Sequence, residues 1–209
     1  MKKLLGVLIL GLIPSSPALA QRHYPRVEIS GAYSYLRTHV LFEPVIPKGW
    51  SASVVCNLHR NFGIEANLSG HYGRNQARYA PDLWHDYSSH FFMFGWRYAQ
   101  RFRKMTLWAH SLLGASNARV EGRVHTKTAD QGSLVVDYGE SRRAYAWAAG
   151  GGIDVDVYRH FAIRLIQADY VDGSRAVSMS SYWGDTYYTL YNSFGRSNNL
   201  RLSFGVVWK

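Results

Sequence analysis

The chain has 209 residues, a formal net charge of +10, and a composition that is 47% hydrophobic and 15% aromatic. So basic a chain could bind nucleic acid, but its arginines are scattered and it begins like an exported protein, so we expect no nucleic-acid partner. The single cysteine, Cys56, excludes an intrachain disulfide, so stability has to come from backbone pairing and packing.

The first twenty residues have the three parts of a secretory signal. Lys2 and Lys3 precede an apolar run over 4–13, and Ala18-Leu19-Ala20 forms a cleavage site. The run is about half as long as a membrane-spanning helix requires. We therefore expect residues 1–20 to be a cleaved signal peptide and residues 21–209 to form one domain. Because residue 21 is Gln, we expect no lipoprotein anchor.

The remaining sequence alternates between apolar and polar residues with a period of two, which is typical of strands with two different faces. The clearest example is the C-terminal segment, where Leu200, Leu202, Phe204, Val206 and Trp208 share one face and mostly polar or small residues share the other. The pattern predicts eight strands, over residues 27–38, 50–59, 64–72, 87–98, 106–118, 144–157, 161–171 and 199–208.

The connections between these strands alternate in length. Three are short, near residues 60–62, 99–104 and 158–160, and four are long, near 39–49, 73–86, 119–143 and 172–197. Short periplasmic turns and long extracellular loops are typical of bacterial outer-membrane barrels. The sequence therefore predicts an all-β fold, an eight-stranded antiparallel up-and-down transmembrane β-barrel in the outer membrane.

Two strands are difficult to assign to an inner and an outer face. For 106–118 we predict that Leu107 and Leu113 face lipid and that His110 faces the lumen. In 161–171, placing Gln167 and Asp169 inside would turn Arg164 outward. That conflict requires either a snorkelling arginine near the turn or a β-bulge.

An eight-stranded barrel has an interior just wide enough for its own side chains. Buried charges persist there only when they are paired and hydrogen-bonded. We predict a structural lumenal network made of Glu28, Glu65, Arg97, Asp154 and Arg201, with Asp156 as a further inward candidate. Glu28 and Asp156 could instead be hydrated at the rims. Asp154 and Asp156 lack nearby His or Cys ligands, so we expect no metal, and no motif predicts a cofactor.

Four segments resemble a known family. They are 91–98 (FFMFGWRY), 150–157 (GGGIDVDV), 162–170 (AIRLIQADY) and 198–208 (NNLRLSFGVVW), and they resemble the outer membrane protein beta-barrel domain, the OmpA/OmpX-like eight-stranded group. The resemblance covers nearly all of the mature chain and implies an architecture, not a reaction. It also implies that the assembly machinery recognises the last strand, although here Lys209 follows the terminal aromatic residue, Trp208.

Two other function classes stay open at this point. Some small outer-membrane barrels modify the acyl chains of lipid A, and His85, Asp86, Ser88, Ser89 and His90 contain the residue types of a hydrolytic triad, although sequence proximity is weak support. We therefore expect no catalytic residues. A secreted lipocalin-like barrel would also have eight strands, but its apolar face would point inward to a ligand.

The most aromatic long connection is a candidate contact surface. It contains Tyr182, Trp183, Tyr187, Tyr188 and Tyr191, and aromatic side chains bury a large area at a low entropic cost. These rings could equally dip into the headgroup layer. We expect the partners to be outer-membrane lipids, including lipopolysaccharide phosphates, together with the assembly machinery and an unidentified extracellular ligand.

Overall fold

The computed structural model describes the backbone of residues 24–40, 43–77, 80–127, 133–183 and 186–209. Side chains are described for the same residues except 39–40, 43–45, 75–77, 80–85, 120, 122–127, 133–142, 174–183 and 186–198. Over the described part of the chain, no helix is long and apolar enough to cross a membrane.

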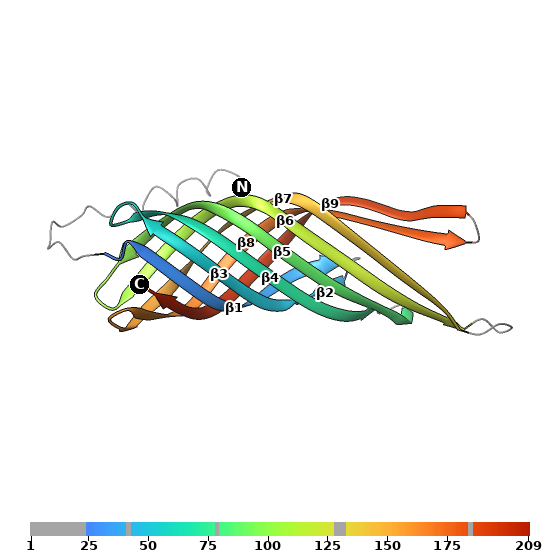
Figure 1. The fold of residues 1–209 in the computed structure, drawn as a ribbon, viewed down its shortest axis with the longest axis horizontal. Helices are drawn as coiled ribbons and strands as arrows, with labels where there is room; N and C mark the ends of the chain where they lie inside the picture. The colour runs from blue at the N-terminus through green and yellow to red at the C-terminus, as the bar shows by residue number, and fades with distance from the viewer. Residues whose placement is uncertain (1–23, 41–42, 78–79, 128–132, 184–185) are drawn as a thin grey trace, which may run out of the picture.

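The described residues form one antiparallel sheet that closes on itself (Figure 1). Its strands are β1 (Val27–Val40), β2 (Glu43–Val45), β3 (Lys48–Asn57), β4 (Phe62–Ala77), β5 (Ala80–Arg101), β6 (Met105–Lys127), β7 (Ser133–Tyr158), β8 (Phe161–Trp183) and β9 (Thr186–Trp208). The short β2 pairs only with the end of β1. The other eight strands are neighbours in sequence order, and β1 pairs with β9, so the prediction of an eight-stranded up-and-down barrel is confirmed.

The seam between the first and last strands is continuous. Its register runs from Ile29 opposite Trp208 to Arg37 opposite Leu200. Closure matters because an open sheet edge would leave unpaired N–H and C=O groups in hydrocarbon, where no water can satisfy them. The C-terminal strand β9 therefore supplies half of the backbone pairing that completes the barrel.

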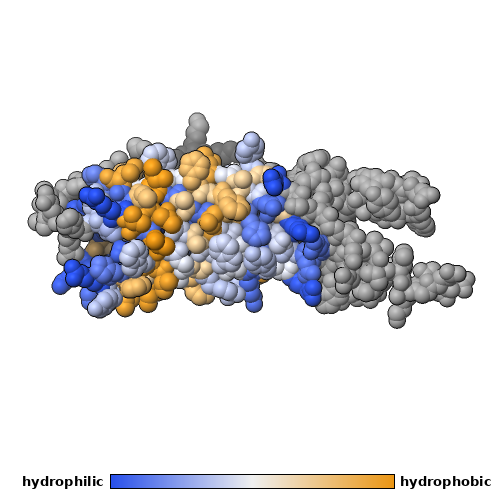
Figure 2. All heavy atoms as spheres, in the orientation of Figure 1, coloured by the Kyte–Doolittle hydropathy of each residue, from blue (hydrophilic) through white to orange (hydrophobic). Residues whose placement is uncertain are grey.

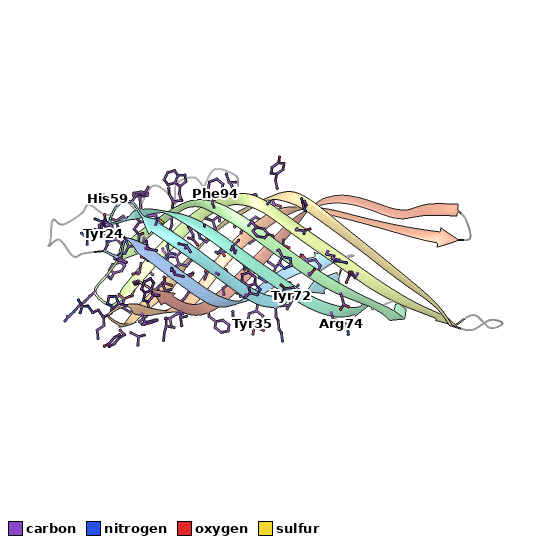
Figure 3. The ribbon with its side chains drawn as sticks, in the orientation of Figure 1. Tyr24, Tyr35, His59, Tyr72, Arg74 and Phe94 are labelled. Atoms are coloured by element: carbon purple, nitrogen blue, oxygen red, sulfur yellow. The ribbon has the colours of Figure 1, made fainter. Side chains whose placement is uncertain are left out.

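The wall of the barrel is apolar on its outer surface (Figure 2). The side chains of Phe92, Phe94 and Trp96 on β5 are 58%, 66% and 63% exposed, and they alternate with the buried Met93 and Arg97. Figure 3 shows Tyr35 and Tyr72 toward one edge of this surface and His59 toward the other end. The prediction that the apolar faces point outward is confirmed. A lipocalin-like binding barrel requires the inverse distribution.

A β-bulge on β8 resolves the conflict at Arg164. On β9, Gly205 and Ser203 are two positions apart, but their partners Arg164 and Gln167 are three positions apart. The extra residue lets both Leu165 and Ile166 face outward, so Arg164 and Gln167 are both buried in the lumen. Of the two solutions that the sequence left open, the structure has the bulge.

The strands are longer than the sequence predicted. The long connections were predicted to be loops, but paired backbone continues through most of them, for example from β6 into β7 as far as Lys127 opposite Ser133. Alternation identifies a strand only where one face meets lipid and the other a lumen. Beyond the membrane neither face has to be apolar, so strand pairing continues there without alternation of apolar and polar residues in the sequence.

An apolar cluster fills the lumen toward the long hairpins. It consists of Leu36, Phe91, Met93, Leu112, Ala146, Ala148 and Val171, all of which are nearly inaccessible to solvent. These residues share strands with the inward-facing polar residues, but they lie farther from the short turns. The buried lumenal side chains are thus largely charged toward the short turns and include this apolar cluster toward the long hairpins.

Candidate lumenal site

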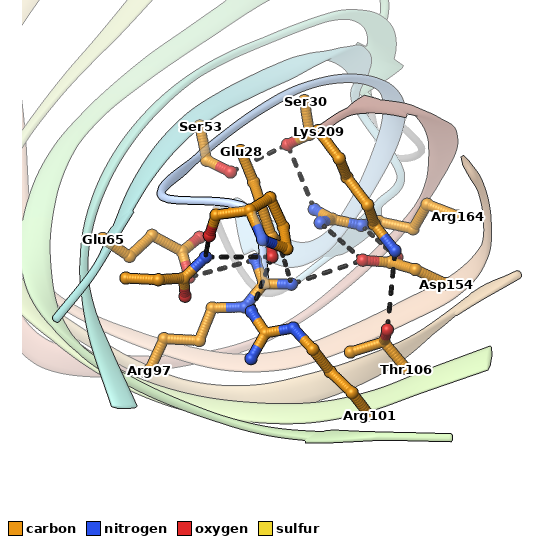
Figure 4. A network of polar contacts seen from close by, with 12 residues as sticks. Glu28, Ser30, Ser53, Glu65, Arg97, Arg101, Thr106, Asp154, Arg164 and Lys209 are labelled. Atoms are coloured by element: carbon orange, nitrogen blue, oxygen red, sulfur yellow. Dashed lines mark hydrogen bonds and ion pairs between the residues drawn. The ribbon is translucent and has the colours of Figure 1, made fainter. Parts of the chain in front are cut away.

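A charged cluster fills the lumen toward the short turns (Figure 4). It consists of Glu28 on β1, Glu65 on β4, Arg97 and Arg101 on β5, His110 on β6, Asp154 on β7, Arg164 and Asp169 on β8, and Arg201 on β9. Inward projection follows from the period of two, and the narrow bore then brings residues from opposite walls within contact distance.

Arg97 lies at the centre of this charged cluster. Its guanidinium nitrogens are 3.3 Å from Asp154 Oδ2, 3.5 Å from Glu28 Oε2 and 3.7 Å from Glu65 Oε2. All four side chains are at most 1% exposed. One arginine thus joins carboxylates from three different strands, which is the arrangement that lets buried charges persist.

Arg164 forms a two-pronged contact with Asp154. Its Nε donates to Oδ1 at 2.9 Å and its Nη2 donates to Oδ2 at 3.3 Å, while Nη1 donates to the Gln167 side chain at 2.9 Å. Such bidentate pairs are the stronger and more directional ion pairs. The bulge on β8 is what brings this guanidinium inside.

Trp108 lies between the two central arginines. The guanidinium carbons of Arg97 and Arg164 are 4.2 and 4.5 Å from the centre of the indole ring, so each makes a cation–π contact. Gly152 makes room for this ring, because a Cβ at that position would lie 2.6 Å from Trp108 Cζ2. Gly152, the last glycine of the run on β7, therefore permits close packing against an aromatic ring.

His110 connects the Arg97 group to Arg201. Its Nδ1 is 3.0 Å from Glu65 Oε2 and its Nε2 is 3.0 Å from Asp169 Oδ1. Ionised carboxylates only accept hydrogen bonds, so two such partners suit an imidazolium with a proton on each nitrogen. Arg201 then donates to Asp169 through Nε at 2.8 Å, and its Nη1 donates to Asn67 and Ser69.

Two further pairs lie at the mouth on the side of the short turns. Arg101 Nη2 donates to Glu28 Oε1 at 2.7 Å, and Lys209 Nζ donates to Asp156. Glu28 is buried, whereas the Asp156 side chain is 36% exposed and lies at the rim. Lys209 is also held by its backbone, because its N–H donates to the His160 carbonyl at 2.9 Å.

The structure places all five predicted network residues inside the barrel. Glu28, Glu65 and Asp154 contact Arg97 directly, and Arg201 joins them through Asp169 and His110. The main omissions from the predicted network are Arg164, Asp169, His110, Arg101 and Trp108. Only the adjacent apolar pair Leu165-Ile166 signalled the bulge that brings in Arg164.

Two of the residues with triad chemistry, Asp86 and His90, contact residues outside that segment. Asp86 accepts two hydrogen bonds from Arg74, at 2.7 and 2.9 Å, and His90 Nε2 is 3.0 Å from the Tyr72 hydroxyl. Ser89 is buried, whereas Ser88 is only half-buried. The His85 side chain lies outside the described residues. Among the residues that can be described, no group of three or more His, Cys, Asp or Glu side chains could hold a metal ion.

The aromatic contact surface belongs to the β8–β9 hairpin. Its backbone pairs Tyr182 with Tyr187 and places Tyr188 and Tyr191 farther along β9. The side chains of Tyr182, Trp183, Tyr187, Tyr188 and Tyr191 lie outside the described residues.

The closed eight-stranded sheet, its apolar outer wall and its charged lumen define an integral β-barrel of the bacterial outer membrane. Neisserial surface protein A has a similar structure, with a TM-score of 0.53 and 10% identity over 88% of this chain and 97% of that one. A major outer membrane protein from Thermus thermophilus gives a TM-score of 0.50 and 8% identity, over 87% and 98%. Ail of Yersinia pestis gives 0.49 and 16%, over 87% and 97%. No family model and no curated protein matches the sequence.

Proposed function

We propose that the barrel is a closed scaffold and that its long hairpins act as an interaction surface outside the cell. The observation that carries this proposal is the set of almost fully buried side chains inside the barrel, which form a charged cluster and an apolar cluster. A barrel built this way suits the presentation of extracellular segments better than the passage of solutes.

Conductance in planar lipid bilayers tests whether the lumen is closed. We expect the folded wild-type protein to give no steady ion current. A porin with a wide water-filled channel, reconstituted in the same way, serves as the positive control. A steady wild-type current would contradict the closed-scaffold proposal.

The β8–β9 hairpin is the part of the surface that we propose makes contacts. Its aromatic residues Tyr182, Trp183, Tyr187, Tyr188 and Tyr191 offer large, rigid side chains of the kind enriched in binding surfaces. The ligand is unidentified, so the probe is a panel of immobilised polysaccharides and extracellular proteins. Cells displaying the wild type should bind at least one member, and cells displaying the five-serine variant should not.

A matched control separates contact from general damage to the hairpins. Leu134, Val135 and Val136 belong to the β6–β7 hairpin, and serine at these positions should leave binding unchanged. Equal loss in both variants, or no binding by the wild type, would contradict a contact role for the β8–β9 hairpin.

The proposal also treats the protein as a non-enzyme that meets the assembly machinery through β9. Mass spectra of lipid A from cells with and without the protein should be identical, and a change in acyl composition would contradict this.

Trp208→Ala should lower the assembled, heat-modifiable fraction of the protein, because the terminal aromatic residue is the expected recognition element for the assembly machinery.

A further inference from the structure

The end of the barrel that carries the short turns has a rim of exposed cations. We call Arg26, Arg60, Arg103, Lys104 and Arg159 the cationic rim; each side chain is exposed, and they come from all three short turns and the segment before β1. Figure 2 shows hydrophilic side chains at this end, next to the apolar band.

The charge of the cationic rim is not neutralised by its neighbours. None of its five members forms an ion pair with a described carboxylate, and the partly exposed Asp156 is the one acidic side chain at that end, among the described residues, that is not buried. Glu28 and Asp154 are buried in the lumen, and Asp156 is paired with Lys209. At the opposite edge, by contrast, Arg74 pairs with Asp86 and Arg119 with Glu121.

The depth of the cationic rim follows from the apolar residues beside it. Arg60 lies two residues from both Leu58 and Phe62, and Arg159 directly follows Tyr158 and lies two residues before Phe161. The exposed Leu58, Phe62, Tyr158 and Phe161 form the edge of the apolar wall. Two strand residues span about 7 Å, roughly the thickness of a headgroup layer. The cations therefore lie at the level of lipid phosphates.

We propose that the cationic rim binds anionic phospholipid headgroups in the periplasmic leaflet of the outer membrane. Short turns face the periplasm in barrels of this class. Unpaired cations held at headgroup depth by adjacent apolar anchors fit phosphodiester groups, which Arg and Lys bind through charge-assisted hydrogen bonds. This proposal depends on the fold alone and not on the role of the hairpins.

Native mass spectrometry of the folded protein in detergent micelles tests the proposal. The probes are phosphatidylglycerol and phosphatidylcholine at equal concentration. The wild type should retain phosphatidylglycerol preferentially. The variant Arg60→Gln/Arg103→Gln/Arg159→Gln should lose this preference by about tenfold at low salt, and 0.5 M salt should weaken the wild-type preference as well.

Two control variants show whether a loss of lipid preference comes from the position of the cations or from their charge. Arg37→Gln/Lys48→Gln/Arg143→Gln removes the same number of exposed cations from strands at the opposite edge and should keep the preference. The variant Arg60→Lys/Arg103→Lys/Arg159→Lys keeps the charge and should retain most of the preference for phosphatidylglycerol. Heat-modifiability on gels shows that each variant is folded.

The proposal is overturned if the wild type shows no lipid preference or if both glutamine variants lose it equally. Sedimentation with isolated peptidoglycan in the absence of a lipid preference would also overturn it, and would assign the rim to the cell wall.

Discussion

The charged cluster and the apolar cluster occupy the same bore but are stabilised by different physical means. In the charged cluster each guanidinium has carboxylate partners from other strands, so its stability depends on a complete set of pairs. In the apolar cluster no partner is specific, and stability depends on filled volume. The difference implies that the first region is sensitive to the identity of a residue and the second to its size.

The largest expected effect is the loss of one carboxylate from the charged cluster. Asp154→Ala leaves Arg97 and Arg164 buried with fewer partners, so we expect the free energy of unfolding to fall by about 4 kcal/mol. Urea unfolding in phospholipid vesicles measures this. Asp156→Ala is the matched control at the rim, where a partly exposed pair contributes about 1 kcal/mol or less. Equal effects would mean that burial of the pair is not decisive.

Truncation in the apolar cluster should come next. Leu112 is fully buried in the lumen, and Leu112→Ala should cost about 3 kcal/mol through lost contacts and a cavity. The neighbouring Leu113 faces lipid, so Leu113→Ala should cost far less, because acyl chains can fill the space. The same unfolding measurement compares the two, and a larger loss for Leu113 would reverse the assignment of faces.

Much of this comparison could be predicted from the sequence, because an outer face in lipid and an inner face in a narrow bore impose a strict period of two. The eight strands and the inward direction of Glu65, Arg97 and Asp154 follow from that constraint. The partners do not follow from it. Which carboxylate meets Arg97 depends on the stagger of the strands around the bore, and alternation within single strands does not determine that stagger.

A smaller effect should come from changing the geometry of a cation while keeping its charge. Arg201 contacts Asp169 through two nitrogens and also reaches Asn67 and Ser69. Arg201→Lys keeps the charge but cannot reproduce this fork, so we expect a loss of about 2 kcal/mol in the free energy of unfolding. A loss as large as that of Arg201→Ala would contradict this, because it would mean that the charge alone contributes nothing to stability.

The smallest effect concerns the ring between two guanidiniums. Trp108→Phe keeps an aromatic face for Arg97 and Arg164, whereas Trp108→Leu removes it. We expect the leucine variant to be less stable than the phenylalanine variant by about 1 kcal/mol, measured by the same urea titration. If the two variants are equally stable, the indole acts as packing volume alone.

The bulge at Leu165-Ile166 acts on strand β8 as a one-letter insertion acts on a reading frame. Even-numbered residues face the lumen before the bulge and odd-numbered residues face it afterwards, so Arg164 and Gln167 both lie inside. Deleting Ile166 would restore strict alternation and leave Arg164 and Gln167 inside, whereas deleting a residue from a regular stretch of β8 would turn every position on one side of the deletion to the other face of the wall. One extra residue thus sets which side chains on the two halves of β8 face the lumen.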